Sequence, residues 1–184
     1  MASLKVPVGP ADHTLGDESA LVTLVEYGDY QCPHCAHAHP IVSRLKKHFG
    51  RQLRFVFRNF PLTQIHEYAE VAAEAAEFAG AAGHFWEIHD GIFENQNRLG
   101  VPFLKELATK IGLSSEKLEA ALESHEYLDR IKADFMGGVR SGVNGTPTFF
   151  INNKRYENAP EFDAMVEAID EQMAGRKMEQ RLAG

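Results

Sequence analysis

Apolar and polar positions in the first part of the chain predict two strands around one helix. Residues 21–27 form a mostly aliphatic and β-branched run, long enough for a buried parallel strand. Apolar positions recur at helical spacing from residue 41 to residue 49, and a second strand-like run occupies residues 53–58. A right-handed crossover through the helix then makes the two strands parallel in one sheet.

The middle of the chain, residues 63–140, shows almost no strand signal and repeated helical periodicity. Alanines dominate residues 65–79, which allows close helix packing, and an apolar stripe that contains His89 marks the next helix. Further helices are indicated by Pro102 and Ser115 at two helix starts and by a stripe of Leu128, Ile131, Phe135 and Val139. We expect these stripes to form core, with His89 as a hydrogen-bonded core histidine rather than a catalytic one.

Strand signals return near the end of the chain. Residues 148–151 and the residues around 155–156 are joined by the turn Asn152-Asn153, which tolerates positive φ and therefore predicts a hairpin. A final helix begins at Glu161, and its apolar residues share one face: Phe162, Met165, Val166, Ile169 and Met173.

Sheet segments thus lie at both ends of the chain, with helices between them. The sequence predicts an α/β fold in which residues 1–62 and 141–175 form one discontinuous domain and residues 63–140 form a helical insertion. Residues 176–184 are polar and predict a frayed tail.

Composition narrows the classes of function. The 184 residues, 44% of them hydrophobic, suit one compact domain or one domain with an insertion. A net charge of -7 without a basic run argues against a nucleic-acid partner. Met1 to Pro10 lacks a basic region followed by an apolar run, and no later stretch approaches membrane-spanning length. We therefore expect no membrane insertion and a cytoplasmic location, or a periplasmic one if a leader has been removed.

The two cysteines of the chain lie in the sequence Cys32-Pro33-His34-Cys35, where the first strand meets the helix. Unpaired N–H groups and the positive end of the helix dipole favour a thiolate at Cys32, and His34 adds to this when it is protonated. Cys35, one turn into the helix, should be more buried and less ionised. An attacking and a resolving thiol are what exchange through a mixed disulfide requires.

Three other interpretations of the two cysteines are available. A structural disulfide across two residues would close a very short loop and stabilise little. A metal site is suggested by Cys32, Cys35, His34, His37 and His39, but zinc usually takes four ligands from two separated pairs, and no second pair is present. The cysteines could also be small core residues. We favour the redox pair and expect no metal and no other cofactor.

Four segments, in order, resemble the DsbA-like thiol-disulfide oxidoreductases of the thioredoxin superfamily. They are VEYGDYQCPHC at residues 25–35, FRNFPL at 57–62, HFWEIHD at 84–90 and GTPTFFI at 145–151. The resemblance covers about residues 12 to 172 and implies a thioredoxin-like fold with an inserted α-helical domain.

The same resemblance assigns roles to residues outside the cysteine pair. Pro147 matches the family's cis-proline beside the active cysteines, which leaves the backbone at Thr146 free to pair with an extended substrate. Glu26 matches a buried acid below the second cysteine that could relay a proton to or from Cys35. Pro40 matches the proline that kinks the first helix. On the residues alone, Glu26 would be a surface charge at a strand end and Pro147 an ordinary trans proline.

The predicted activity is exchange of the Cys32/Cys35 dithiol or disulfide with cysteines of protein substrates through a mixed disulfide at Cys32. A redox partner would recycle the pair. The direction stays open, because Thr146 departs from the aliphatic residue of the most oxidising members. The alternatives are a glutathione transferase of the kappa type or a chromene-carboxylate isomerase, which typically lack the second cysteine, and a redox-inactive peptide-binding module.

Overall fold

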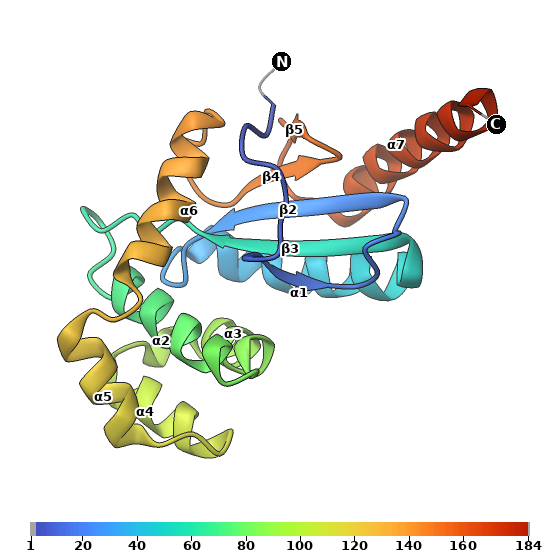
Figure 1. Cartoon of the computed structure of the whole chain (residues 1–184). Coiled ribbons are helices and arrows are strands. Elements are labelled where there is room, and N and C mark those ends of the chain that lie inside the picture. Colours follow the sequence, from blue (N-terminus) through green and yellow to red (C-terminus); the bar gives the residue numbers. More distant parts are fainter. Residues whose placement is uncertain (1–2, 184) are drawn as a thin grey trace.

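The computed structural model describes residues 3–183 and contains five strands and seven α-helices there (Figure 1). In chain order these are β1 (His13–Leu15), β2 (Val22–Gly28), α1 (Pro33–Phe49), β3 (Leu53–Asn59), α2 (Ala69–Ala81), α3 (Phe85–Glu94), α4 (Val101–Lys110), α5 (Ser115–Ser124), α6 (Leu128–Arg140), β4 (Thr148–Ile151), β5 (Lys154–Tyr156) and α7 (Phe162–Ala183). Short 3-10 helices occupy Gly50–Gln52 (η1) and Gln96–Arg98 (η2). The thioredoxin-like α/β fold with helices inserted between β3 and β4 is therefore confirmed.

The five strands form one sheet in the order β1-β3-β2-β4-β5. β2 and β3 are parallel, with Val22 opposite Leu53, so the predicted strand, helix, strand unit is confirmed. The hairpin of β4 and β5 is also confirmed, and its turn residues Asn152 and Asn153 have φ of 44 and 71 degrees. β1, antiparallel to β3, was missed because three residues are too short for a periodic pattern.

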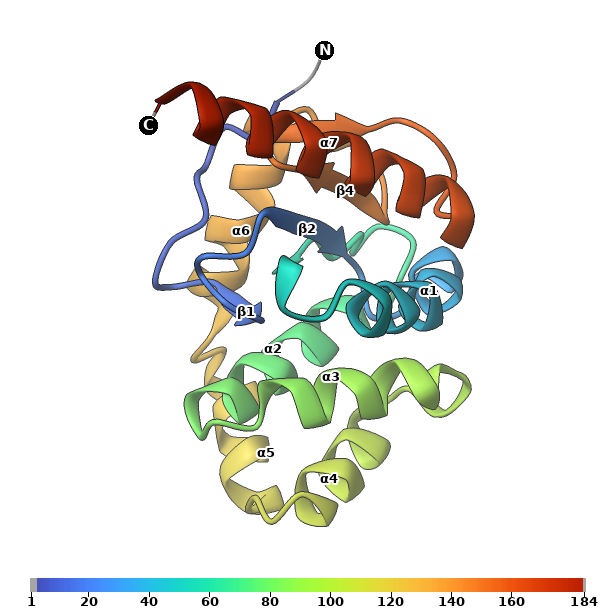
Figure 2. The same cartoon turned by 90° about the vertical axis from the view of Figure 1, so that its right-hand side faces the viewer.

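Helices cover both faces of the sheet (Figure 2). α1 and α7 pack on one face, where Val22 and Leu24 belong to the larger apolar core. α6 and the N-terminal segment cover the other face, where Val25 and Tyr27 belong to a smaller core. Because side chains alternate along a strand, β2 contributes to both cores, and Glu26 lies on the α1 face.

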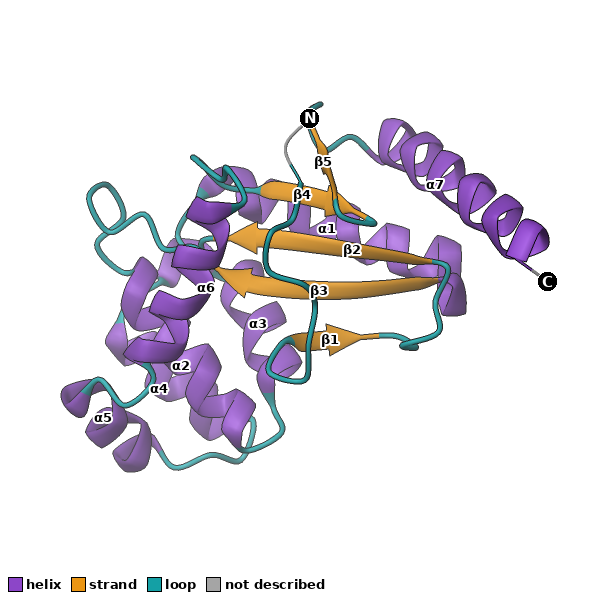
Figure 3. Ribbon diagram, turned by 45° about the horizontal axis from the view of Figure 1, so that its top comes forward, coloured by secondary structure: helices purple, strands orange, loops and turns teal. Residues whose placement is uncertain are grey.

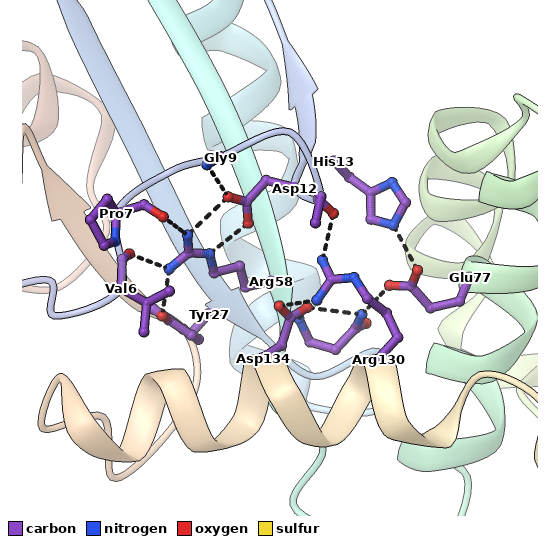
Figure 4. A network of polar contacts seen from close by, with 12 residues as sticks. Val6, Pro7, Gly9, Asp12, His13, Tyr27, Arg58, Glu77, Arg130 and Asp134 are labelled. Atoms are coloured by element: carbon purple, nitrogen blue, oxygen red, sulfur yellow. Dashed lines mark hydrogen bonds and ion pairs between the residues drawn. The ribbon is translucent and has the colours of Figure 1, made fainter.

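The N-terminal segment crosses the sheet from one edge to the other (Figure 3). Leu4 donates its N–H to Asn153 beside β5, and the segment ends in β1 at the opposite edge. Its path is held by the guanidinium of Arg58 (Figure 4), which donates hydrogen bonds to the carbonyls of Val6 and Pro7.

Helices α2 to α5 gather beyond the β1 edge of the sheet, away from α7 (Figures 1 and 2). The predicted stripe of α6 is partly wrong, because Val139 is 46% exposed and the buried side of the helix carries Ile131, Asp134, Gly137 and Gly138. At Gly138 a Cβ would lie 2.7 Å from the ring of Phe60, so glycine permits the close approach of α6 that periodicity could not show.

The end of the chain also differs from the prediction. The frayed tail expected after residue 175 is instead the continuation of α7, which runs to Ala183. Met165, Ile169 and Met173 are its buried residues, as predicted, whereas Arg176, Lys177 and Met178 are exposed. Good helix formers at these positions extend the helix beyond the part that packs.

No helix within residues 3–183 combines the length and the apolar character needed to cross a membrane.

Candidate active site

The cysteine pair lies at the junction of β2 and α1. Cys32 is the residue before the first turn of α1, with extended backbone at φ -70 and ψ 122 degrees, and Pro33 opens the helix. Proline suits this position because its missing N–H would have no partner inside the helix. Pro40 lies inside α1, as expected for the kink position.

Asp29 anchors the loop between β2 and the cysteines. Its buried carboxylate accepts hydrogen bonds from the N–H groups of Gln31 and Leu62, both at 2.8 Å, and contacts His66 at 2.7 Å. The N–H of Asp29 points to Cys35 Sγ at 3.5 Å. This residue therefore connects the active-site loop to the segment after β3, and neither Asp29 nor His66 was singled out from the sequence.

Cys32 is the acidic thiol. A hydrogen bond from the Cys35 thiol, together with contacts to Thr146 and the N–H groups of Cys35 and His34, lowers the pKa of Cys32 to about 5 although burial acts against this. Its Sγ lies 3.3 Å from the carbonyl oxygen of Thr146. His34 lowers the pKa of Cys32 through its backbone N–H at the helix N-terminus. The side chain of His34 is exposed.

Cys35 is fully buried, and burial, the hydrogen bond to Cys32 and the charge of Glu26 raise the pKa of its thiol. Both cysteines are reduced in this structure. The contrast between an acidic Cys32 and a non-ionised Cys35 agrees with the expectation from their position at a helix start.

Glu26 lies on the α1 face of β2 and is 3% exposed. Burial raises the pKa of its carboxyl to about 8, with an opposing influence from Lys46. The surface charge suggested by the residues alone is therefore wrong, because β2 is covered on both faces up to its end. A buried carboxyl that titrates near neutral pH can exchange a proton with a neighbouring group.

The loop before β4 approaches the cysteines from the other side. Its Thr146-Pro147 peptide bond is cis, and Thr146 contacts Cys32 through the carbonyl described above. The hydroxyl oxygen of Thr146 is buried and has no hydrogen-bond partner among residues 3–183. The loop thus places a hydroxyl group without a hydrogen-bond partner beside the acidic thiol of Cys32.

Gln96 is a site residue that sequence reasoning missed. Its side-chain amide donates to the carbonyls of Tyr30 and Cys32, at 2.9 Å each, from η2 in the helical insertion. Nothing in the local sequence indicates this contact, because Gln96 and Cys32 are brought together only by the packing of α3 near α1.

The histidines of α1 do not join the cysteines in one cluster. His34 and His37 are exposed, whereas His39 turns toward His89 and Asp90 of α3. His89 is 2% exposed and bonded to the hydroxyl of Tyr30 at 3.0 Å, which confirms the predicted core histidine.

This chain is similar to a known family over most of its length and to a part of several antiporters. The family described as Thioredoxin matches residues 9–171. The Na(+)/H(+) antiporter NhaA 1 of Salinispora arenicola is 41% identical over 97% of this chain, and the chain spans only 27% of that protein.

Solved structures of similar fold include oxidised BdbD from Bacillus subtilis, with a TM-score of 0.85, 26% identity and coverage of 94% of this chain and 98% of that one. α-DsbA1 from Wolbachia pipientis has a TM-score of 0.83 and 20% identity, and the match covers 96% of this chain and 97% of that one.

The expected cytoplasmic location is wrong. The similar structures include a periplasmic thioredoxin-like protein from Salmonella enterica, at a TM-score of 0.74, 20% identity and coverage of 90% and 92%, and the curated relatives are antiporters. The expectation depended on the first residues of the chain, which do not show whether a preceding segment exists.

Proposed function

This chain belongs to the DsbA-like thiol-disulfide oxidoreductases of the thioredoxin superfamily, and we propose that it exchanges disulfides with cysteine-containing polypeptides through Cys32 and Cys35. The observation that supports this most directly is an acidic Cys32, with a pKa of about 5, next to a buried Cys35 whose pKa is raised. The first thiol is then a nucleophile at neutral pH and the second holds its proton until it is needed.

In the reducing direction, the Cys32 thiolate attacks one sulfur of a substrate disulfide. A Cys32–substrate disulfide forms and the other substrate sulfur leaves as a thiolate. Cys35 then gives up its proton and attacks Cys32 Sγ, which closes the Cys32–Cys35 disulfide and releases the second substrate thiolate. The substrate gains two electrons and the protein loses two, and the same steps in reverse oxidise a substrate dithiol.

Glu26 is proposed as the group that exchanges a proton with Cys35, accepting it when the carboxyl is ionised and returning it when the carboxyl is protonated. Its carboxyl lies buried on the α1 face of β2, and its pKa of about 8 lies between those of a free carboxyl and a free thiol. The charge of Glu26 is also one of the influences that raise the pKa of Cys35, which indicates that the two groups are close enough to respond to each other.

Disulfide donation is the direction that the site favours. A low pKa at Cys32 stabilises the reduced form relative to the disulfide, which makes the disulfide a stronger oxidant. A partner that accepts electrons from the reduced pair, itself a disulfide or another two-electron oxidant, would then return the protein to the disulfide form.

A polypeptide substrate is favoured by the surface beside the site. An apolar hollow of about 380 Å³ is lined by Phe60, Leu62, Ile65, Phe135, Val139 and Val143, and it continues to Asn144 two residues before Thr146. Ile65 is 71% exposed and Val139 is 46% exposed, so apolar side chains are open to solvent at this hollow, and a contiguous exposed apolar patch is typical of an interaction site. We propose that apolar residues next to the substrate cysteine occupy this hollow, while the backbone at Thr146 and Pro147 pairs with the substrate strand.

Trapping of intermediates tests the proposal. Cys35→Ser should accumulate mixed disulfides with cellular polypeptides, because the second attack is lost, and reductant should release them. Cys32→Ser is the matched control and should trap none. Equal and small amounts of trapped polypeptide in the two variants would exclude exchange with polypeptides.

The hollow can be tested separately. Ile65→Asp and Val139→Asp should slow exchange with an unfolded, cysteine-containing polypeptide by about tenfold, since burying a charge opposes apolar docking. Exchange with glutathione should be unchanged. Leu182→Asp, at an exposed apolar position of α7, is the control. If the three variants slow polypeptide exchange alike, the hollow is not the docking surface.

A further inference from the structure

A second cluster of ligand-type side chains lies between α1 and α3. His39 comes from α1, one turn after Cys35, and His89 and Asp90 come from α3. One nitrogen of each histidine and one carboxylate oxygen of Asp90 all lie within 4.8 Å of one another. The residues are about fifty positions apart in sequence, so only the docking of the inserted helices on the redox helix assembles the cluster.

The histidine nitrogens and the Asp90 oxygen of this cluster lie near one another, and no hydrogen bond joins His39 to Asp90. His39 Nε2 and Asp90 Oδ1 are 3.6 Å apart, which is too long for a hydrogen bond. Asp90 Oδ1 is buried and has no hydrogen-bond partner among the residues that the structure describes.

The ring of His89 is fixed in place by its surroundings. It is enclosed by aromatic side chains, including Phe57 and Trp86, and Tyr30 Oη lies 3.0 Å from Nδ1. Histidine ligands are usually fixed in this way by a hydrogen bond at the nitrogen that does not bind the ion.

We propose that His39, His89 and Asp90 bind a divalent transition-metal ion of the zinc and cobalt type, which joins the redox helix α1 to the inserted helix α3. Two imidazoles and one carboxylate suit these ions, whereas calcium and magnesium prefer sites made of oxygen alone. Ligand atoms around a tetrahedral ion bound at about 2.1 Å are roughly 3.4 Å apart, close to the separation of His39 and Asp90. The remaining coordination position is left for water.

Binding would add a direct link between α1 and α3, which the chain joins through β3 and α2. An ion that binds the folded arrangement and not the unfolded chain stabilises the fold by mass action. Its ligands do not include the redox cysteines, so ion binding and disulfide exchange are separable properties.

The site is tested on the full chain with both cysteines in the disulfide, so that thiolates cannot bind the ion. Zn²⁺ is titrated by calorimetry and Co²⁺ by its visible absorption. We expect one ion per chain and a rise in melting temperature with Zn²⁺. His39→Gln and Asp90→Asn should each weaken binding by at least about tenfold and remove the rise, because each deletes one of three ligands. His37→Ala, on the exposed side of α1, should bind as the parent does.

Both variants at partly exposed positions are expected to fold, which their melting temperatures without metal will show. The proposal is overturned if the oxidised chain binds no ion, if His39→Gln binds as tightly as the parent, or if ion binding appears only after reduction and disappears in a Cys32→Ser/Cys35→Ser variant. The last result would place the ion on the cysteines instead.

Discussion

Two buried groups of ionisable side chains lie on opposite faces of the same sheet and differ in how their charges are compensated. On the α6 face, Arg58 binds both carboxylate oxygens of Asp12 at 2.7 and 2.9 Å and the hydroxyl of Tyr27 at 2.9 Å (Figure 4). Burial acts to lower the pKa of Arg58, but the hydrogen bonds to Asp12 and Tyr27 raise it. Burial acts to raise the pKa of Asp12, but the hydrogen bonds from Arg58 hold it below its usual value. Both groups stay charged.

On the α1 face the compensation is incomplete. Burial raises the pKa of Glu26 to about 8, and Lys46 offsets this only in part. Cys32 is acidic and Cys35 is not, although both are buried. A fully paired ion network resists titration and holds elements together, whereas a partly compensated group changes protonation near neutral pH. The paired ions on the α6 face therefore hold elements of the fold together, whereas the α1 face carries the groups that can change protonation.

The largest effect is expected on stability, when the ion pair of Arg58 and Asp12 is broken. Arg58→Met should lower the free energy of unfolding by about 3 to 5 kcal/mol, because Asp12 is left buried without its partner. The pKa of Cys32 should not change. Chemical denaturation and a thiol titration measure the two quantities. The exposed pair of Arg98 and Glu106 supplies the control, since Arg98→Met should cost less than about 1 kcal/mol. A changed Cys32 pKa in Arg58→Met would show that the two faces are coupled.

A smaller effect, dependent on pH, is expected at Glu26. The folded carboxyl holds its proton up to about pH 8, whereas the unfolded one loses it near 4.5, so the folded state binds more protons between these values. Its contribution to stability is complete below pH 4.5 and is lost as the pH rises to 8. By pH 7 the loss is on the order of 3 kcal/mol.

Glu26→Gln should therefore gain stability over the reduced parent as the pH rises from 4.5 to 8, measured by urea unfolding at several pH values. Glu18→Gln, at a position 90% exposed, should follow the parent. A constant difference between parent and Glu26→Gln across this range would mean that the carboxyl titrates normally.

The smallest effect is expected on the pKa of Cys32, when the hydroxyl of Thr146 is removed. Thr146→Val removes the hydroxyl beside Cys32, which has no other partner among residues 3–183 and can donate to the sulfur once it is a thiolate. A hydrogen bond to a charged group is worth about 1.5 kcal/mol. We expect the pKa of Cys32 to rise and the disulfide to become a weaker oxidant. Thiolate absorbance against pH and equilibration with glutathione measure these changes. Thr109→Val, on the exposed side of α4, is the control, and an unchanged Cys32 pKa in Thr146→Val would assign the acidity to Cys35 and the helix N–H groups alone.

Much of the fold could be predicted because it depends on local patterns. The apolar runs of β2 and β3, the Asn152-Asn153 turn and the face of α7 are each encoded by neighbouring residues. The cysteine pair could be placed at a helix start for the same reason, and the N–H groups of that helix start are among the influences that lower the pKa of Cys32. The errors lie where the local pattern is weak, at the three-residue β1 and at the side of α6 that glycines turn toward the sheet.

The sequence by itself thus determined the class of fold, the spacing of the two cysteines and the position of the acidic thiol at a helix start. Only the tertiary structure decided that Glu26 is buried, that Gln96 reaches the carbonyl of Cys32, and that His39 meets His89 and Asp90. These features depend on contacts between segments far apart in the chain, and the burial that changes a side chain's pKa or leaves its oxygen without a partner comes from those contacts.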